Sequence, residues 1–309
     1  MANNYGANLQ AYSTACYLRK KGYGVVFICW NDYMSNNTPA VQVDIHRTFL
    51  LRQGFAVTSP CYTDADFVKA IDDNGICNII VGSDCVLTYQ SRLFPFHISR
   101  KGIQRIDKSS DYNFPNPFWL SYIRGRKDIG KFLMSASCGG AGTGYIRKSV
   151  KQSMRNLLSQ YDYVSVRDGF TRDFVRGLLP ASTEIHVTPD PVFGFNANVD
   201  NVPGRREIHD RFHLPERYIV VSFYSFYWPQ QEWADRLMKA AHADGLACVS
   251  LPMPQGGRNS RFDIDVELPL DPMEWYAIIK YSCGYVGNNM HPIIVAMHNN
   301  VPFLSLIHI

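Results

Sequence analysis

Residues 1–30 read MANNYGANLQAYSTACYLRKKGYGVVFICW, and this stretch sets a helix directly before an apolar strand. Apolar side chains recur every three or four positions and predict a helix over residues 7–21. Gly22 ends the helix, and the apolar run after it predicts a strand over residues 24–30. A helix that leads into an unbroken apolar strand is typical of proteins with buried parallel sheets.

The same alternation of short apolar runs and amphipathic stretches continues to the end of the chain. Further strands are expected at residues 76–81, 131–138, 162–166, 184–188, 218–223, 246–251, 283–286 and 302–306. Further helices are expected at residues 64–74, 145–160, 168–179, 229–244, 271–281 and 292–298. Unbroken Val and Ile runs between helices indicate parallel strands that are covered on both faces, so the fold class is α/β.

Turn-rich segments divide the chain into two expected domains. The stretch NANVDNVPGRRE, at residues 196–207, has the composition of a linker. We therefore expect an N-terminal α/β domain at residues 1–196 and a C-terminal α/β domain at residues 207–309. Residues 92–128 interrupt the first domain with prolines, aromatic residues and a surplus of Lys and Arg. An irregular insert of this length is expected to be a functional loop rather than a disordered one.

Composition narrows the function classes only slightly. The net charge of +4 over 309 residues is too weak and dispersed to predict nucleic-acid binding, although it suits an anionic or membrane-associated substrate. The eight cysteines form no CxxC pair, and most lie in apolar runs, which favours buried free thiols. No signal peptide and no apolar run of about 20 residues is present, so we expect a cytoplasmic protein.

Candidate site residues follow the predicted strands, because ligands of open parallel sheets bind beyond the carboxyl ends of the strands. Ser83 and Asp84 follow one strand, and a carboxylate there can act as an acid or base or bind sugar hydroxyls; the alternative is a turn or cap residue. Arg167 ends another strand, where arginine can bind a carboxylate or phosphate with two N–H groups. An ion pair of Arg167 with Asp190 or Asp173 is an equally good interpretation.

A glycine-rich loop, SASCGGAGTGY, follows the strand at 131–138. Its glycines do not have the G-x-G-x-x-G spacing of a dinucleotide site, and no GK[ST] of an ATP loop follows them. We therefore predict neither NAD nor ATP. The glycines would still let a substrate approach the backbone, and Ser137 and Gly139 are candidate substrate-binding residues.

The stretch GYVGNNMHPIIVAMHNN carries the best candidate for catalysis. Pro292 suits the first helical position, which predicts His291 as the helix cap. A helix N-terminus attracts anions, and a histidine there can donate to a phosphate or transfer a proton near neutral pH. His298 follows seven residues later, the wrong spacing for a helical zinc site, so no metal is expected. The turn before the cap consists of Asn288, Asn289 and Met290.

Six segments, in order, resemble the polysaccharide pyruvyl transferase family over nearly the whole chain. NNYGANLQAYSTACYLRKKGY resembles its opening helix, and IIVGSDCV, MSASCG, VSVRD and TPDPVF resemble its later blocks. The last block, from residue 271 to 306, resembles the family's final His-helix-strand segment. The resemblance implies two Rossmann-like domains facing a cleft, a GT-B-like architecture. It also implies that an N-terminal strand and C-terminal helices of the family are missing here.

The resemblance further implies a reaction. Relatives transfer the pyruvyl group of phosphoenolpyruvate onto two sugar hydroxyls, forming a ketal and releasing phosphate. His291 would transfer a proton or bind phosphate, Asp84 would be the alternative base, and Arg167 would bind the donor. Asn4 and Gly6, at another helix N-terminus, are further candidates for substrate binding. No cofactor is expected beyond the donor, and the acceptor would be a glycan or lipid-linked sugar, with peripheral membrane association through that acceptor.

Two other functions stay open. A GT-B glycosyltransferase would share this architecture, and Glu274 would then be a candidate to hold the ribose of a nucleotide sugar. A non-catalytic family member, acting in binding or assembly, is the second alternative. A dehydrogenase is disfavoured by the glycine spacing.

Overall fold

The computed structural model describes residues 3–30, 38–89, 96–99, 102–105, 114–139, 146–224, 228–258 and 260–306, with backbone alone at 96–99 and 102–105. The chain forms two compact units, and each is built from separate segments. Unit 1 comprises Met1, Val26–Met34 and Ala56–Asp190. Unit 2 comprises Ala2–Val25, Ser35–Phe55 and Pro191–Ile309. Each unit is described by itself, and the cleft expected between two domains stays a prediction.

This division differs from the expected domains at 1–196 and 207–309. The N-terminal helix α1 (Tyr5–Lys20) and helix α2 (Ala40–Arg52) belong to the unit that contains the C-terminal sheet. The reason is tertiary packing: the Ser13 hydroxyl of α1 donates to the Pro191 carbonyl over 3.0 Å, and the Tyr12 ring packs edge-on against Phe195. The polar stretch at 196–207 lies within unit 2.

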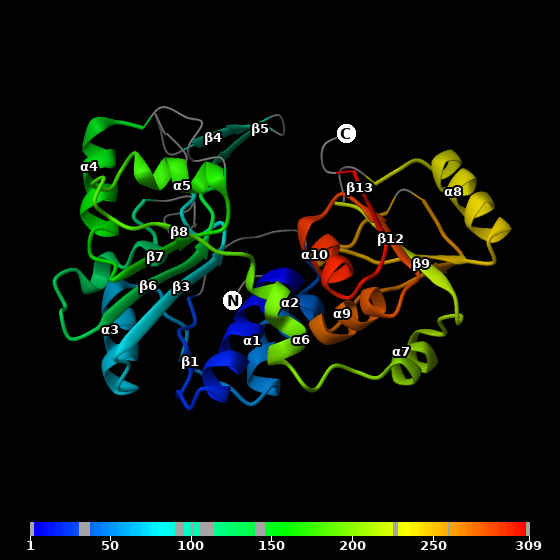
Figure 1. The fold of residues 1–309 in the computed structure, drawn as a ribbon, viewed down its shortest axis with the longest axis horizontal. Coiled ribbons are helices and arrows are strands. Elements are labelled where there is room, and N and C mark those ends of the chain that lie inside the picture. The colour runs from blue at the N-terminus through cyan, green and yellow to red at the C-terminus, as the bar shows by residue number, and fades with distance from the viewer. Residues whose placement is uncertain are drawn as a thin grey trace. The chain divides into compact units, whose positions relative to one another are not determined.

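A four-stranded parallel sheet in the order β3-β6-β7-β8 forms the centre of unit 1 (Figure 1). Its strands are β3 (Asn78–Asp84), β6 (Gly130–Ala136), β7 (Tyr163–Val166) and β8 (His186–Val187). Helices α3 (Asp64–Asp73), α4 (Lys148–Leu158) and α5 (Gly169–Arg176) contribute buried side chains to its core. The short strands β1 (Val26–Phe27) and β2 (Ala56–Val57) pair in parallel, and β4 (Phe96–Ser99) and β5 (Gly102–Arg105) form an antiparallel hairpin.

The end of the predicted insert is part of this core. The 3₁₀ turns η1 (Pro117–Trp119) and η2 (Ser121–Ile123) bury Trp119, Leu120 and Ile123 almost completely. The stretch from 114 to 123 therefore has a structural role, and the expectation of a functional loop within residues 92–128 stays a prediction. Residues 90–95, 100–101 and 106–113 of this region lie outside the described residues.

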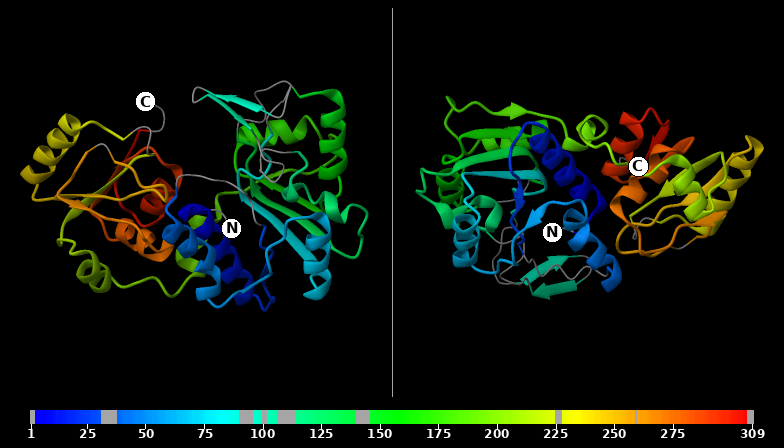
Figure 2. Two further views of the ribbon diagram at one scale, coloured as in Figure 1. Left: turned by 180° about the vertical axis from the view of Figure 1, so that it is seen from behind. Right: turned by 90° about the horizontal axis from the view of Figure 1, so that it is seen from below.

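Unit 2 contains a five-stranded, wholly parallel sheet in the order β11-β10-β9-β12-β13. Its strands are β9 (Tyr218–Ser222), β10 (Ala247–Ser250), β11 (Ile264–Asp265), β12 (Gly284–Gly287) and β13 (Phe303–Ser305). Its remaining helices are α6 (Phe195–Asn198), after the turn η4 (Pro191–Gly194), and α7 (Arg205–Phe212), α8 (Gln231–Ala243), α9 (Pro272–Lys280) and α10 (Met290–His298). Figure 2 shows α1 within this unit, where it packs against α2, α6 and α9.

A buried polar chain joins α1 and α2 to the loop before α9. The His46 side chain is completely buried, with its Nδ1 at 2.5 Å from Asn8 Oδ1 and its Nε2 at 3.1 Å from Gln42 Nε2. Gln42 in turn bonds both backbone groups of Leu270. These bonds satisfy buried polar groups that would otherwise destabilise the core.

His46 makes the stability of the protein depend on pH. Burial, and secondly the charge of Arg52, lowers the pKa of His46 from 6.5 to about 4. Because the unfolded chain binds a proton at His46 below its ordinary pKa and the folded chain does not, this stabilisation is complete above pH 6.5. It is lost as the pH falls towards 4. The loss amounts to about 3 kcal/mol of unfolding free energy.

Urea unfolding at pH 7 and near pH 4.5 checks this expectation. A His46→Gln variant should have a flatter pH dependence than the wild type, because glutamine does not titrate. His298, whose pKa burial also lowers to about 4, contributes equally to both proteins and cancels in the comparison. Equal pH dependence in the two proteins would contradict the assignment.

Most predicted elements are confirmed, and the errors have common causes. Every predicted strand and helix has a counterpart within a few residues. The prediction missed α2, α6, α7 and the short strands β2, β4, β5 and β11, which lack a strong periodic pattern.

All eight cysteines are free thiols, but only Cys61, Cys138 and Cys248 are buried. The expectation of general burial is wrong for Cys77, Cys85 and Cys283, which are exposed.

Candidate functional site

In unit 1, the carboxyl ends of neighbouring strands bring Asp84, Arg167 and Asp190 together. Asp84 ends β3, Arg167 directly follows β7, and Asp190 comes three residues after β8. The Arg167 guanidinium lies 3.1 Å from the Asp190 carboxylate and 3.7 Å from that of Asp84. The side chain of Asp84 is 30% exposed, while those of Arg167 and Asp190 are 12% and 1% exposed. Asp84 is therefore the member of this cluster that solvent reaches best.

The backbone at the end of β3 is shaped to present Asp84. The φ angle of Asp84 is +75°, in the left-handed region that is uncommon for residues other than glycine, although Asn and Asp adopt it more often than most. The preceding Gly82 has no room for a side chain, because a Cβ there would collide with the Met134 carbonyl. Ser83, buried beside it, donates its hydroxyl to the Ser135 carbonyl over 3.1 Å. Such unusual backbone conformations cluster at functional sites.

Residues at the end of β6 support the cluster of Asp84, Arg167 and Asp190 through hydrogen bonds. Ser135 has a φ of +46°, and its hydroxyl bonds Thr188 Oγ1 and the Pro189 carbonyl, so that it holds the segment leading to Asp190. Ser137 is buried, and its hydroxyl accepts the Gly139 N–H over 3.2 Å. Ser83, Ser137 and Gly139 thus lie at the same sheet edge as Asp84, as predicted. The glycines at 140, 142 and 144 lie outside the described residues.

The structure shows which candidate carboxylate pairs with Arg167. Its guanidinium forms ion pairs, with Asp190 at the closer distance and Asp84 farther away. The other candidate partner, Asp173, pairs with Arg172 instead. The ion pair with Asp190 is therefore confirmed, and the binding of an anionic donor by Arg167 stays a prediction.

In unit 2, helix α10 begins two residues earlier than predicted. Its cap is Asn289 and its first residue is Met290, so His291 is the second helical residue rather than the cap. Pro292 is the third residue, where the lack of an N–H is still harmless because the first turn has no internal acceptors. The predicted cap is therefore wrong by two residues, but His291 does lie in the first turn of the helix. In unit 1, Asp168 is the cap of α5, and its side chain accepts the Thr171 N–H.

His291 lies directly against Gly6. A Cβ added to Gly6 would come within 3.0 Å of three atoms of the imidazole, so only glycine leaves room for the ring. Gly6 is the second residue of α1, whose cap Asn4 accepts the Ala7 N–H over 3.2 Å. The candidate residue Gly6 thus comes from the start of α1 to meet His291 at the start of α10, and Asn4 caps the same helix end.

Two helix N-termini therefore converge at the His291 ring. The first turns of α1 and α10 are fully described, and neither contains an Asp or Glu. The first backbone N–H groups of a helix lack internal partners, and its N-terminus carries a partial positive charge. Two such ends with no acidic side chain in their first turns favour an anion at this position.

The turn before α10 is held by a close backbone approach. Gly287 is tightly packed, because a Cβ there would collide with the Ser222 carbonyl and the Tyr285 hydroxyl. The buried Tyr285 hydroxyl donates to the Ser222 carbonyl and interacts with the backbone N–H of Asn289. The Asn288 side chain accepts the Tyr224 N–H over 3.0 Å. Sequence reasoning missed Tyr285, whose apolar context gave no signal of this role.

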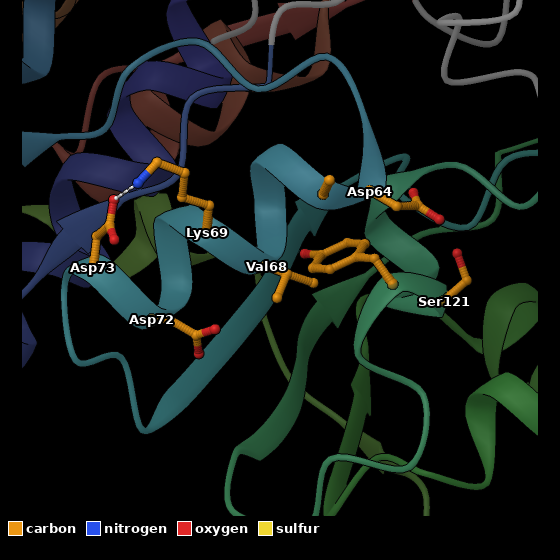
Figure 3. Close-up of a pocket in the computed structure, with 8 residues that line it drawn as sticks. Asp64, Val68, Lys69, Asp72, Asp73 and Ser121 are labelled. Carbon is orange, nitrogen blue, oxygen red and sulfur yellow. Dashed lines mark hydrogen bonds and ion pairs between the residues drawn. The ribbon is translucent and has the colours of Figure 1, made fainter.

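One hollow of unit 1 lies away from these strand ends. A hollow of about 630 Å³ lies between α3 and η2, and Figure 3 shows the side chains that line it. Asp64, Asp72 and Asp73 surround a single lysine, Lys69, which already pairs with Asp73 at 2.7 Å. The excess of carboxylates disfavours an anionic ligand. No candidate residue lines this hollow.

Glu274, the candidate ribose ligand of the glycosyltransferase alternative, has structural partners. It accepts the Asp271 N–H in the capping box of α9 and forms an ion pair with Arg211 at 2.9 Å. Burial is the largest cause that raises the pKa of its carboxyl group. These contacts account for Glu274 without a ligand.

The family comparison covers almost all of these residues. The model of the polysaccharide pyruvyl transferase family matches residues 4–308. The chain belongs to this family. Its members are transferases that act on polysaccharides, and the match spans every candidate site residue of both units. A search of the curated proteins gives no match.

Solved structures show the fold that this family member adopts. It resembles a putative UDP-N-acetylglucosamine 2-epimerase from Listeria monocytogenes, with a TM-score of 0.54 and 11% identity over 98% of this chain and 77% of the other. It also resembles S. aureus MnaA in a structure with UDP, with a TM-score of 0.51 and 10% identity over the same shares of the two chains. At these identities the likeness concerns the fold alone, which is GT-B-like.

The described part of the chain contains neither a membrane-spanning helix nor a metal-binding group of side chains. No helix there has the length and apolar character needed to cross a membrane. No group of three or more His, Cys, Asp and Glu side chains is arranged there to hold a metal ion.

Proposed function

We propose that this protein transfers the pyruvyl group of phosphoenolpyruvate onto two hydroxyls of a sugar and releases phosphate. The observation that carries the proposal is the family match over residues 4–308. The packing of His291 on Gly6 supports it, because a proton-transferring group lies there at two helix N-termini. The acceptor would be a glycan or a lipid-linked sugar, and the reaction would take place in the cytoplasm.

The chemistry defines what the protein must supply. One sugar hydroxyl adds to C2 of the donor while C3 takes up a proton, which gives a tetrahedral carbon that still bears the phosphate. The bond from C2 to the phosphate oxygen then breaks, and phosphate leaves with the electron pair. The second hydroxyl forms the other C–O bond of the ketal. One hydroxyl proton replaces the proton given to C3, and the other leaves with phosphate, so the reaction involves no net oxidation or reduction.

His291 is the proposed proton donor to C3. The imidazole can carry a proton near neutral pH and deliver it to a carbon that is turning into a methyl group. The N-terminal turns of α1 and α10 are the proposed phosphate site, through backbone N–H groups of residues such as Gly6 and Met290. Asn4, Asn288 and Asn289 would shape this site through the turns that they hold.

Asp84 is the alternative base that we propose for the proton of the attacking hydroxyl. It is the most exposed carboxylate of the unit 1 cluster, and Arg167 restrains it. A carboxylate also suits hydrogen bonding to neighbouring sugar hydroxyls. We assign Arg167 a positioning role in place of the donor-binding role expected from the sequence, because Asp190 and Asp84 already compensate its charge.

Ligand-dependent melting of the purified chain tests the proposal without knowledge of the acceptor. Phosphoenolpyruvate, UDP and NAD are added in parallel, with inorganic phosphate as a fourth arm. A ligand at about 100 times its Kd stabilises the folded state by roughly 2.7 kcal/mol, which a melting curve resolves. We expect a shift with phosphoenolpyruvate that is larger than the shift with phosphate and that His291→Ala reduces.

Each other outcome points to a different function. A shift with UDP alone would replace the proposal by a glycosyltransferase. A shift with phosphoenolpyruvate that no sugar converts into phosphate release would favour a non-catalytic family member. Absence of any shift with phosphoenolpyruvate would overturn the proposal.

A further inference from the structure

The contact between Gly6 and His291 raises the question of what holds the start of α1 in place. Side chains of the first turns of α1 can supply this restraint. Two of them, Tyr5 and Asn8, are buried and flank Gly6 in the sequence.

Both of these side chains meet His46 of α2. The Tyr5 ring lies 4.9 Å from the His46 ring and stacks on Trp275 of α9 at 5.0 Å. Asn8 Oδ1 lies 2.5 Å from His46 Nδ1. His46 thus contacts α1 on both sides of Gly6, through a ring contact and through a hydrogen bond.

The backbone of Leu270 fixes the donor and acceptor roles in the row of hydrogen bonds that runs through Gln42 and His46 to Asn8. Gln42 faces both backbone groups of Leu270: its Oε1 accepts the N–H, and its Nε2 donates to the carbonyl, each over 2.8 Å. The amide of Gln42 therefore has a single orientation, and its second Nε2 hydrogen points to His46 Nε2 at 3.1 Å. That ring nitrogen must accept, so the ring proton is on Nδ1 and is donated to Asn8.

The neutral ring with its proton on Nδ1 is the only form that satisfies every partner. A proton on Nε2 would face the Gln42 amide hydrogen, and the bond to Asn8 would lose its donor if the proton moved from Nδ1. Desolvation is the largest cause that disfavours a charged His46 ring, and the charge of Arg52, on the same helix, adds to it. The carboxylates of Asp271 and Glu274 lie nearer the Tyr5 hydroxyl, whose pKa is raised first by burial and then by their charges.

We propose that His46 is a positioning residue, which holds the N-terminal turn of α1, and with it Gly6, against the ring of His291. The row of hydrogen bonds from Leu270 through Gln42 and His46 to Asn8 transmits the restraint from the loop before α9 to α1. In catalysis it would fix both the His291 ring and the N–H groups of the adjoining helix turn. This role rests on the proposed function, whereas the restraint on the ring of His291 does not.

The first test needs no activity. In the full chain labelled at its nine histidines, the NMR signal of His291 is identified by its loss in His291→Ala. We expect His46→Leu and the milder Asn8→Ala to shift this signal, because both break the bond to α1. His46→Gln should restore it, since glutamine can donate to Asn8 and accept from Gln42. Phe49→Ala is the matched control: it removes a buried ring that joins α2 to Tyr12 of α1, outside the chain of hydrogen bonds.

The second test uses phosphate release from phosphoenolpyruvate. A displacement of about 1 Å at a reacting group can lower a rate by up to about 10²-fold, so we expect kcat to fall by up to that factor in His46→Leu and Asn8→Ala, with a smaller change in KM. His46→Gln should recover most of the rate, and Phe49→Ala should lower the melting temperature while leaving kcat near the wild-type value.

The outcomes separate this inference from the proposed function. If the wild type releases no phosphate, the proposed function fails, and the NMR comparison still decides whether His46 positions His291. The inference is overturned if Asn8→Ala and His46→Leu leave the His291 signal in place, or if Phe49→Ala moves it as far as they do. Should His46→Leu not fold, Asn8→Ala and His46→Gln decide by the same criteria.

Discussion

Replacement of His291 by alanine is expected to lower phosphate release from phosphoenolpyruvate by about 10² to 10⁴-fold, the usual contribution of a general acid or base. The ring lies in the first turn of α10 and packs on Gly6. The loss of rate is measured by steady-state kinetics with a panel of sugar diols as acceptors, in which the release of phosphate is recorded for each diol. The melting temperature should change little, because His291 is only partly buried.

A Gly6→Ala variant tests whether the rate depends on the position of the His291 ring, because the ring itself is still present. The added Cβ would come within 3.0 Å of the imidazole, so the ring has to move although its chemistry is unchanged. We expect a loss of rate smaller than that of His291→Ala, and no further loss when the two changes are combined. Independent, multiplying losses would show that Gly6 acts elsewhere, and a normal rate in His291→Ala would exclude the proposed proton transfer.

The largest effect on stability is expected from Arg167→Ala. This change removes the guanidinium that pairs with the almost completely buried Asp190 at 3.1 Å. Removal of one partner from a buried ion pair typically destabilises a protein by about 3–5 kcal/mol, because the other charge stays in a poorly solvated place. Chemical unfolding of the purified chain, followed by fluorescence and circular dichroism, measures the loss.

Two further variants test the cause of this loss. Asp190→Asn in the Arg167→Ala background should recover part of the stability, since it removes the uncompensated carboxylate. Arg172→Ala is the matched control: this arginine pairs with Asp173 at 3.0 Å on the exposed face of α5, and such surface pairs contribute about 1 kcal/mol or less. If Arg167→Ala destabilised the chain no more than Arg172→Ala, the buried pair would not have the role that we give it.

Local sequence patterns determined the secondary structure of this protein and the class of its fold. Apolar runs such as those of β9 and β12 predicted buried parallel strands, because only strands covered on both faces are apolar throughout. The strand ends also indicated where to look for chemistry, and Asp84, Arg167 and His291 lie at such ends. The family resemblance, which the match over residues 4–308 confirmed, rests on the same short segments.

Patterns of this kind do not extend to contacts between distant segments. The sequence left open whether Arg167 binds a ligand or an ion-pair partner, since the choice depends on where β8 brings Asp190. Nor did it predict that α1 and α2 pack in the unit of the C-terminal sheet. That assignment depends on contacts such as those of Ser13 with Pro191 and of Gln42 with Leu270.

The contact between Gly6 and His291 shows most clearly what local sequence predicts and what only the tertiary structure decides. Each residue was a candidate because of its place near a helix N-terminus, which local sequence reveals. Their pairing depends on the packing of α1 against α9, α2 and α10, and no periodic pattern encodes a contact between the two ends of a chain. The sequence alone determined the helices and their charged ends, and only the tertiary structure decided that two of those ends meet.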